Sequence, residues 1–193
     1  MKQEIKERPS VADLEAELKR VRYQSRYQAT LRSTIYTLIT VAAVAVLVAT
    51  LWLPVLRIYG SSMTPTLQDG EIVFSVKTKN MEPGDVIAFY YNNKILIKRV
   101  IANAGEWVNI TEDGTVYVND AELTEPYVQE KSLGDADIEL PYQVPDGKYF
   151  VMGDHRETSS DSRHTAVGCI SPDQVVGKIV FRVWPLNQLG VVE

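Results

Sequence analysis

Three stretches of this chain hold side chains of the kinds that carry out catalysis. A turn-like segment, GSSMTP, contains Ser61 and Ser62, and a serine hydroxyl becomes a nucleophile once a base removes its proton. An apolar run, ILIKRVIA, places Lys98 among branched hydrophobic residues. Residues 152–168 bring aspartate, serine and arginine together directly after another apolar run. These groups are sufficient for acyl transfer by an activated serine.

Each stretch also has an ordinary explanation that the residues alone do not exclude. A serine in a turn usually serves only the turn, and Lys98 at a strand edge can extend its ammonium into water. Residues 152–168 can form an exposed hydrophilic loop, which would hold His164. Charged residues flank the other histidine, His155, and nothing in the sequence connects it with Ser62. A Ser-His-Asp triad is therefore not favoured.

Lys98 is the candidate base if its apolar neighbours bury it. On a pleated strand Leu96 and Val100 share its face, and burial disfavours the charged ammonium. An unperturbed lysine, with a pKa near 10.4, is neutral in about one molecule in 2,500 at pH 7. Lowering the pKa by two units raises that fraction about a hundredfold, and a neutral amine can accept a serine proton. The residues alone therefore leave two interpretations of Lys98: the base of a Ser62–Lys98 dyad, or an ordinary lysine at a strand edge.

The serine segment follows an apolar run that predicts a membrane anchor. Residues 34–53 carry no charge, and a helix of this length spans about 30 Å, the thickness of the hydrocarbon core. A buried core helix would show a polar face, and a cleavable signal peptide would be shorter and nearer the N-terminus. Residues 1–32 contain eight Lys and Arg against five acids. We therefore predict a single-pass cell-membrane protein with a cytoplasmic N-terminus and its remaining chain on the outer face.

The segment before the anchor shows apolar residues at helical spacing. Val11, Leu14, Leu18 and Val21 would share one helix face. A solvated juxtamembrane helix is favoured, with a partner helix or short coiled coil as the alternative. The predicted organisation is a helical segment at 1–33, an anchor at 34–53 and an extracytoplasmic β-rich domain at 54–193.

After the anchor the pattern changes to short runs rich in Val, Ile, Phe and Tyr, separated by turn residues. The predicted strands are residues 71–77, 85–91, 94–102, 107–111, 115–118, 148–154 and 175–185. Asn92-Asn93 suits a tight hairpin, because asparagine tolerates positive φ. Residues 119–147 are acidic and irregular, which indicates a surface excursion. We predict a mainly antiparallel β domain, tethered so that Ser62 stays near the membrane surface.

Composition excludes several other classes of function. The net charge of −5 gives no indication of nucleic-acid binding. Cys169 is the only cysteine, so no intrachain disulfide can form. With no cluster of cysteine and histidine, neither zinc nor another metal is expected.

Taken in this order and behind an anchor, SSMTPTL, IKRVI and GDHRETSSDSR resemble three sequence boxes of the bacterial type I signal peptidases, and EPGDVIAF resembles a fourth. The resemblance implies that Ser62 is the nucleophile and Lys98 the general base. Its supporting residues would be Ser159, which orients the lysine amine, the ionic pair Asp161 and Arg163, and the loop residues Asp154 and Arg156. The Ser62 backbone N–H would be one oxyanion donor.

Two positions depart from the family pattern. Some members carry a hydroxyl residue two positions before the nucleophile, where this chain has Gly60, so a second oxyanion donor must come from a water or the region of Ser61. His155 stands where asparagine is usual, and we expect this change to be tolerated because the position is not the base.

The resemblance also implies the fold, substrate and partners. The fold would be coiled antiparallel sheets with an SH3-like barrel portion. The enzyme would remove signal peptides from exported preproteins after Ala-x-Ala, at the lipid bilayer and close to the secretion translocon, with no cofactor. Shallow apolar pockets would admit the small side chains, and an extended peptide could pair with a strand edge. The matching pocket residues are Leu56, Ile58, Met63, Val73, Ala88, Leu96 and Ile97.

Two other functions fit parts of the sequence. A Ser-Lys autoprotease of the SOS-repressor type would share the catalytic residues, but such proteins are soluble and the anchor argues against this function. A catalytically silent, membrane-tethered β domain would retain the fold without the dyad, and both dyad residues are present. Cleavage of an Ala-x-Ala peptide separates the enzyme from the silent domain.

Overall fold

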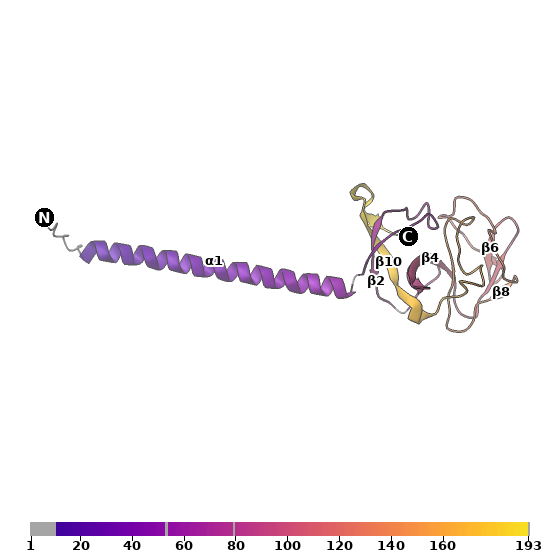
Figure 1. Ribbon diagram of the computed structural model, residues 1–193, viewed down its shortest axis with the longest axis horizontal. Coiled ribbons are helices and arrows are strands. Elements are labelled where there is room, and N and C mark those ends of the chain that lie inside the picture. Colours follow the sequence, from indigo (N-terminus) through magenta and orange to yellow (C-terminus); the bar gives the residue numbers. More distant parts are fainter. Residues whose placement is uncertain (1–10, 53, 79, 193) are drawn as a thin grey trace. The chain divides into compact units, whose positions relative to one another are not determined.

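The computed structural model describes residues 11–52, 54–78 and 80–192 as a long helix and a β-rich unit, each considered by itself (Figure 1). The predictions for residues 1–10 and residue 53 lie outside the described residues. Among the described residues, the predicted mainly antiparallel β fold with one N-terminal helix is confirmed.

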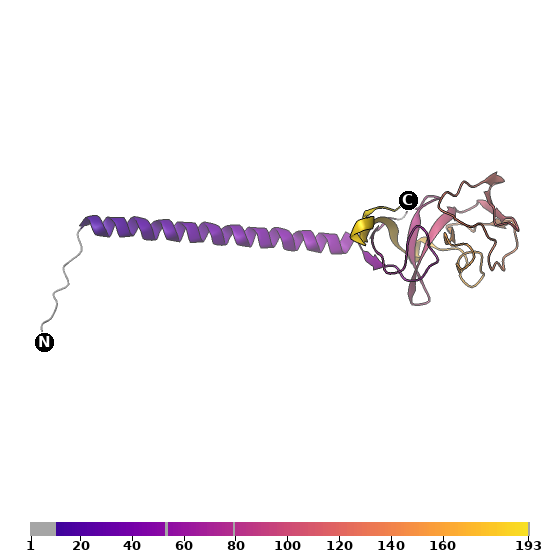
Figure 2. The same ribbon diagram turned by 90° about the horizontal axis from the view of Figure 1, so that it is seen from above.

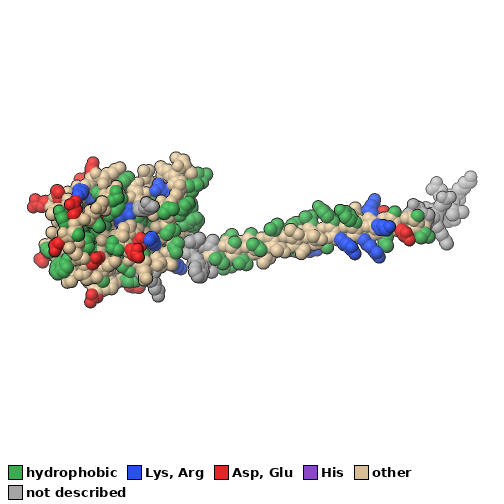
Figure 3. Space-filling model, turned by 180° about the vertical axis from the view of Figure 1, so that it is seen from behind, with side chains coloured by type: hydrophobic (Ala, Val, Ile, Leu, Met, Phe, Trp, Pro, Cys, Tyr) green, Lys and Arg blue, Asp and Glu red, His purple; other side chains and the backbone are tan. Residues whose placement is uncertain are grey.

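The helix α1 (Val11–Trp52) runs without a break through the described parts of the predicted juxtamembrane segment and anchor (Figure 1 and Figure 2). Its stretch Leu14–Val48 is long and apolar enough to cross a membrane, by length and composition. Thr34, Thr37 and Thr40 donate their hydroxyls to carbonyls four residues earlier, so these polar groups need no water. Lys and Arg side chains gather toward the N-terminal end of the helix (Figure 3).

The β-rich unit contains eleven short strands and two 3₁₀ turns within the described residues. The strands are β1 (Val55–Arg57), β2 (Ile72–Val76), β3 (Val86–Tyr91), β4 (Lys94–Ala102), β5 (Trp107–Ile110), β6 (Val116–Val118), β7 (Ala121–Glu122), β8 (Tyr142–Gln143), β9 (Phe150–Met152), β10 (Val175–Trp184) and β11 (Gly190–Val191). The turns are η1 (Pro172–Gln174) and η2 (Leu186–Gln188).

All strand pairs are antiparallel, and they form two sheets. The larger has the order β1-β2-β10-β3-β4-β9, with β11 beside β10, and the smaller has the order β7-β6-β5-β8. β10 lies beside β2 in Figure 1 and pairs with β3 along its other edge. Register shifts in both pairings mark bulges, which bend and twist a strand. This bending allows one ten-residue strand to serve several partners in a coiled sheet.

The predicted hairpin at Asn92-Asn93 is confirmed. Both residues have positive φ, 43° and 63°, and Tyr91 pairs with Lys94 across the turn. Joining β3 to β4 in this way aligns Lys98 with Ile87, a fully buried residue of β3. The tight turn thus determines which residue faces the Lys98 position.

One expectation about irregular segments was wrong, and a second was right only in part. Residues after Pro54 are no free tether, because β1 pairs with β2 and aligns Leu56 with Val73. Residues 119–147 contain β7 and β8, and β8 completes the smaller sheet by pairing with β5. In both segments the strands are only two or three residues long, and their pairing partners rather than their own sequence stabilise them.

Three apolar clusters form the core of the unit. One of them lies beside the serine segment and joins β1, β2, β3 and β10. Its buried members are Ile58, Met63, Leu67, Val73, Val86, Ala88, Ile179 and Val192. Met63 directly follows Ser62, so this cluster anchors the turn that carries the hydroxyl.

Candidate active site

The serine segment is a turn held at several points. The Gly60 N–H donates to Asp69 Oδ1 at 2.7 Å, and the His155 N–H donates to the carbonyl of Ser62 at 3.1 Å. Met63 is 2% exposed and packs into the core. Ser62 is itself half-buried, which leaves its hydroxyl partly open to solvent.

Gly153, at the end of β9, allows a second loop to approach this turn. A Cβ at this position would lie 2.5 Å from the carbonyl oxygen of Ser62 and 2.2 Å from Ser159 Oγ. No side chain fits within such distances, so the backbones can meet only at glycine. The loop that follows Gly153 is thereby placed against the nucleophile turn.

Lys98 reaches the same turn from β4. Its Nζ lies 2.7 Å from Ser62 Oγ, and the residue is 3% exposed. Burial lowers the pKa of Lys98 from 10.5 to about 8; Asp161 and Asp154 act to raise the pKa, and Arg163 acts to lower it. With a pKa of about 8, about one molecule in ten holds a neutral amine at pH 7. Lys98 is therefore no exposed strand-edge lysine.

Asp161 and Arg163 form a buried ion pair in the loop that follows Gly153. Arg163 donates to both carboxylate oxygens, each at 2.9 Å, and the Gly153 N–H donates to Asp161 Oδ2 at 2.9 Å. Burial acts to raise the pKa of Asp161, but the hydrogen bond and charge of Arg163, together with hydrogen bonds from the Gly153 N–H and the Ser159 side chain, hold this pKa below its ordinary value. The carboxylate thus stays ionised and fixes the backbone that contacts Ser62.

Asp154 and Arg156 have partners outside their own loop. Asp154 accepts two hydrogen bonds from Arg99, at 2.9 and 2.8 Å, and Arg156 donates to both oxygens of Glu125. All four side chains are buried. Such bidentate pairs are directional, so they fix the loop against β4 and against the segment that contains Glu125.

Ser159 and His155 have local contacts that differ from the expected ones. Ser159 Oγ is buried against Gly153 and contributes to lowering the pKa of Asp161, whereas the expected hydrogen bond between Ser159 and the Lys98 amine is not present. The His155 ring nitrogen Nδ1 lies 2.9 Å from Thr158 Oγ1, and His155 contacts Ser62 through its backbone. A backbone contact explains how histidine can replace asparagine at this position.

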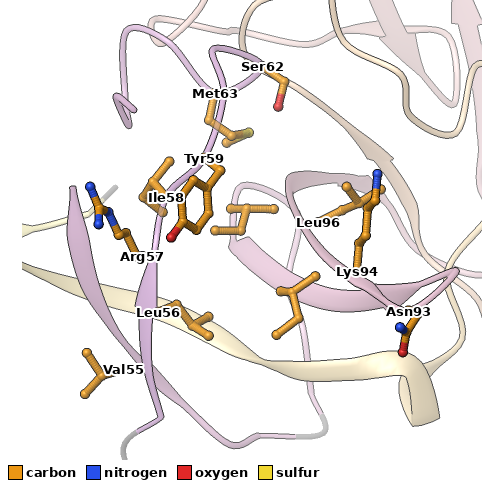
Figure 4. A pocket seen from close by; sticks show the side chains of 13 residues that line it. Val55, Leu56, Arg57, Ile58, Tyr59, Ser62, Met63, Asn93, Lys94 and Leu96 are labelled. Atoms are coloured by element: carbon orange, nitrogen blue, oxygen red, sulfur yellow. The ribbon is translucent and has the colours of Figure 1, made fainter. Parts of the chain in front are cut away.

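An apolar groove of about 640 Å³ ends at Ser62 (Figure 4). It lies between residues 55–63 and residues 93–97. Five of the expected pocket residues line it: Leu56, Ile58, Met63, Leu96 and Ile97. Val73 and Ala88 do not, because they are fully buried in the core cluster that includes Ile58 and Met63.

Two free strand edges border this groove within the described strands. β1 pairs with β2 alone, at one end of the larger sheet. The first half of β4, residues 94–98, pairs with β3 on one side, while β9 pairs only with residues 99–102. Both edges therefore present backbone groups to an extended peptide.

Comparison with known proteins identifies the family. The family model described as signal peptidase, peptidase S26, matches residues 31–184. The chain belongs to this family. It is 41% identical over 152 residues to signal peptidase IB of Staphylococcus aureus, covering 68% of this chain and 78% of that protein. It is 38% identical over 143 residues to signal peptidase I T of Bacillus subtilis, covering 67% and 73%.

The solved structures include a signal peptidase I from Enterococcus faecalis V583, which is 31% identical. That match covers 53% of this chain and 98% of the other, with a TM-score of 0.43. The resemblance predicted from the sequence boxes is confirmed by the family match, and the chain is a serine peptidase of the signal peptidase I type.

In this signal peptidase, sequence reasoning assigned no role to Arg99 or Glu125. Arg99 directly follows Lys98, and this position next to the candidate base is the sequence feature that could have indicated a role for Arg99. Glu125 lies 31 residues from its partner Arg156, in an acidic segment with no pattern to distinguish it. Only the folded structure shows that Glu125, unlike most acidic residues of its segment, is buried and paired with an arginine.

Proposed function

We propose that this signal peptidase cleaves exported preproteins after small residues through a Ser62–Lys98 dyad. The observation that carries the proposal is the separation of 2.7 Å between Lys98 Nζ and Ser62 Oγ at the end of an apolar groove. A buried amine beside a half-buried hydroxyl is the arrangement that an activated serine needs.

The proposed reaction has two stages. The neutral amine of Lys98 accepts the Ser62 proton while Ser62 Oγ bonds to the carbonyl carbon that precedes the cut. The C–N bond then breaks, the leaving amine takes the proton from Lys98, and an ester with Ser62 remains. Lys98 next removes a proton from water, which attacks the ester. The proton passes to Ser62 Oγ as the carboxylate product leaves.

The proposed oxyanion donor is the backbone N–H of Ser62. Gly60 contributes no second donor, because it has no side chain and its own N–H donates to Asp69. Asp161, Arg163, Asp154 and Arg156 would act indirectly, by holding the loop at residues 153–163 against the dyad.

The groove supports a preference for small side chains. Its walls are mainly apolar, and the fully buried Val73 and Ala88 belong to the same core cluster as the wall residues Ile58 and Met63. We propose that this packed layer keeps the pockets shallow, so that a methyl group fits and a larger side chain is rejected. The free edges of β1 and β4 would hold the peptide extended through backbone hydrogen bonds.

The sequence supports anchoring with the N-terminus in the cytoplasm. α1 contains a stretch that is long and apolar enough to span a membrane, and eight Lys and Arg residues precede its uncharged residues 34–52. The β-rich unit also exposes a set of large apolar side chains that would suit contact with lipid: Phe181, Trp184, Leu186, Leu189 and Val191. We propose that the β-rich unit acts at the outer membrane surface, near the secretion translocon.

Cleavage of a matched peptide pair tests the proposed function. The full chain in vesicles should cleave a fluorescence-quenched Ala-x-Ala peptide, and phenylalanine in place of the last alanine should lower kcat/KM at least about a hundredfold. The reason is steric, because the pocket floor is fully packed. Equal cleavage of both peptides would contradict the proposed specificity, and cleavage of neither would contradict the function.

The rate should also depend on pH in a defined direction. Because the base must be neutral and the pKa of Lys98 is about 8, kcat/KM should rise about tenfold per pH unit below pH 8 and level off above it. An unperturbed lysine would give a rate still rising near about pH 10. Measurement of kcat/KM from about pH 6 to about pH 10 distinguishes the two, and a rate independent of pH would exclude Lys98 as the base.

A further inference from the structure

A second, smaller cavity borders the nucleophile turn at Thr64, just past the residues that line the apolar groove. Its volume is about 130 Å³, enough for roughly one side chain. Gln129 and Glu130 form one wall, and the loop at residues 154–157 forms another. None of its lining residues belongs to the groove.

Buried contacts hold both walls in place. The loop contacts the nucleophile turn through the hydrogen bond from the His155 N–H to the Ser62 carbonyl. Arg156 binds Glu125 through two hydrogen bonds, and the Arg99 guanidinium lies 3.9 Å from the centre of the Tyr127 ring. The segment that carries Glu130 is thus fixed relative to Ser62.

Of the charged side chains that line this cavity, some have ion-pair partners and others have none in the described part of the chain. Asp154 and Arg156 are both paired and buried, so each is neutralised by its partner. Glu130 and Glu157 are exposed, and the described residues offer neither of them a salt bridge. The lining of the cavity therefore includes two exposed carboxylates with no salt bridge among the described residues.

We propose that this cavity is the subsite for the first residues after the cut, and that Glu130 and Glu157 make it favour cationic and reject acidic side chains. The inference rests on the proposed function: if the groove takes the residues before the cut, the residues after the cut continue past Ser62. The cavity adjoins Ser62 through Thr64, two positions along the turn, and through His155, whose N–H donates to the Ser62 carbonyl. An extended peptide advances about 3.3 Å per residue, so the test covers each of the first three residues after the cut.

The expected effect is modest because both carboxylates are exposed. Each exposed charge pair contributes at most about 1 kcal/mol, and salt screens it. Exchanging lysine for glutamate in the substrate reverses the interaction with both carboxylates. The preference for lysine over glutamate should therefore be about tenfold in kcat/KM at low ionic strength.

The test uses the full chain in uncharged phosphatidylcholine vesicles. Quenched Ala-x-Ala peptides carry Lys, Gln or Glu at the first, second or third residue after the cut. The enzymes are the wild type, the double variant Glu130→Gln/Glu157→Gln and a control, Glu112→Gln/Glu139→Gln. The control removes the same charge from exposed positions that do not line the cavity. The measured quantity is the ratio of kcat/KM for the Lys and Glu peptides within each enzyme.

At one or more of the three substrate positions, we expect the Lys-to-Glu ratio of kcat/KM to be about ten in the wild type and in the control. This ratio should fall toward one in Glu130→Gln/Glu157→Gln, and it should also fall toward one at high salt. An unchanged ratio in that variant would overturn the proposal, as would an equal fall in the control. If the wild type cleaves the Gln peptides but its kcat/KM ratio for the Lys and Glu peptides is one at every position, this inference alone is overturned. A wild type that cleaves no peptide would overturn the proposed function.

Discussion

Replacing Ser62 by alanine, or Lys98 by methionine, should lower kcat for preprotein cleavage by about 10⁴-fold or more. Without the Ser62 hydroxyl no ester forms, and without the Lys98 amine nothing removes the proton from that hydroxyl. Because the two groups act as one unit, the double variant should be no slower than the slower single variant. Single-turnover assays of a preprotein in vesicles measure all three variants.

Two matched controls separate this effect from general damage. Ser160→Ala removes an exposed serine from the supporting loop, and Lys77→Met removes an exposed lysine at the end of β2. Both should retain activity within about twofold, as exposed substitutions usually do. Full activity in Ser62→Ala or Lys98→Met would refute the dyad, and additive losses in the double variant would show that the two residues act separately.

Substituting Asp161 by asparagine should have the largest effect on stability. Arg163 is 1% exposed and would lose its carboxylate partner, and breaking a buried ion pair in this way costs about 3–5 kcal/mol of unfolding free energy. Denaturant unfolding measures this loss. As a control, Glu122→Gln breaks an exposed pair with Lys131 and should cost less than about 1 kcal/mol.

The same substitution should shift the pH profile of the folded enzyme to lower pH. Asp161 acts to raise the pKa of Lys98 and Arg163 acts to lower it, so removing the Asp161 carboxylate leaves only Asp154 to oppose the lowering effects of burial and of Arg163. The rising part of the kcat/KM profile should then lie below that of the wild type, whose midpoint is near pH 8. A profile shifted to higher pH would contradict this account, and unchanged stability would show that the pair is not a supporting contact.

The amino-acid pattern by itself determined the local elements and the class of reaction. The uncharged run at residues 34–53 predicts a helix because only a helix satisfies its own backbone in an apolar medium, and α1 contains residues 34–52 of that run. Short runs rich in Val, Ile, Phe and Tyr predict strands, and Asn92-Asn93 predicts the turn that joins two of them, because these preferences act between neighbouring residues. The sequence boxes around Ser62 and Lys98 were sufficient to indicate the family.

The tertiary structure alone decided how these parts support one another. Asp154 pairs with Arg99 and Arg156 with Glu125, across 55 and 31 residues, and no local preference selects such partners. β1 exists because β2 is available to pair with it. The pKa of Lys98 falls to about 8 because packing around β4 removes water from the amine, and burial is a property of the assembled fold rather than of a residue and its neighbours in sequence.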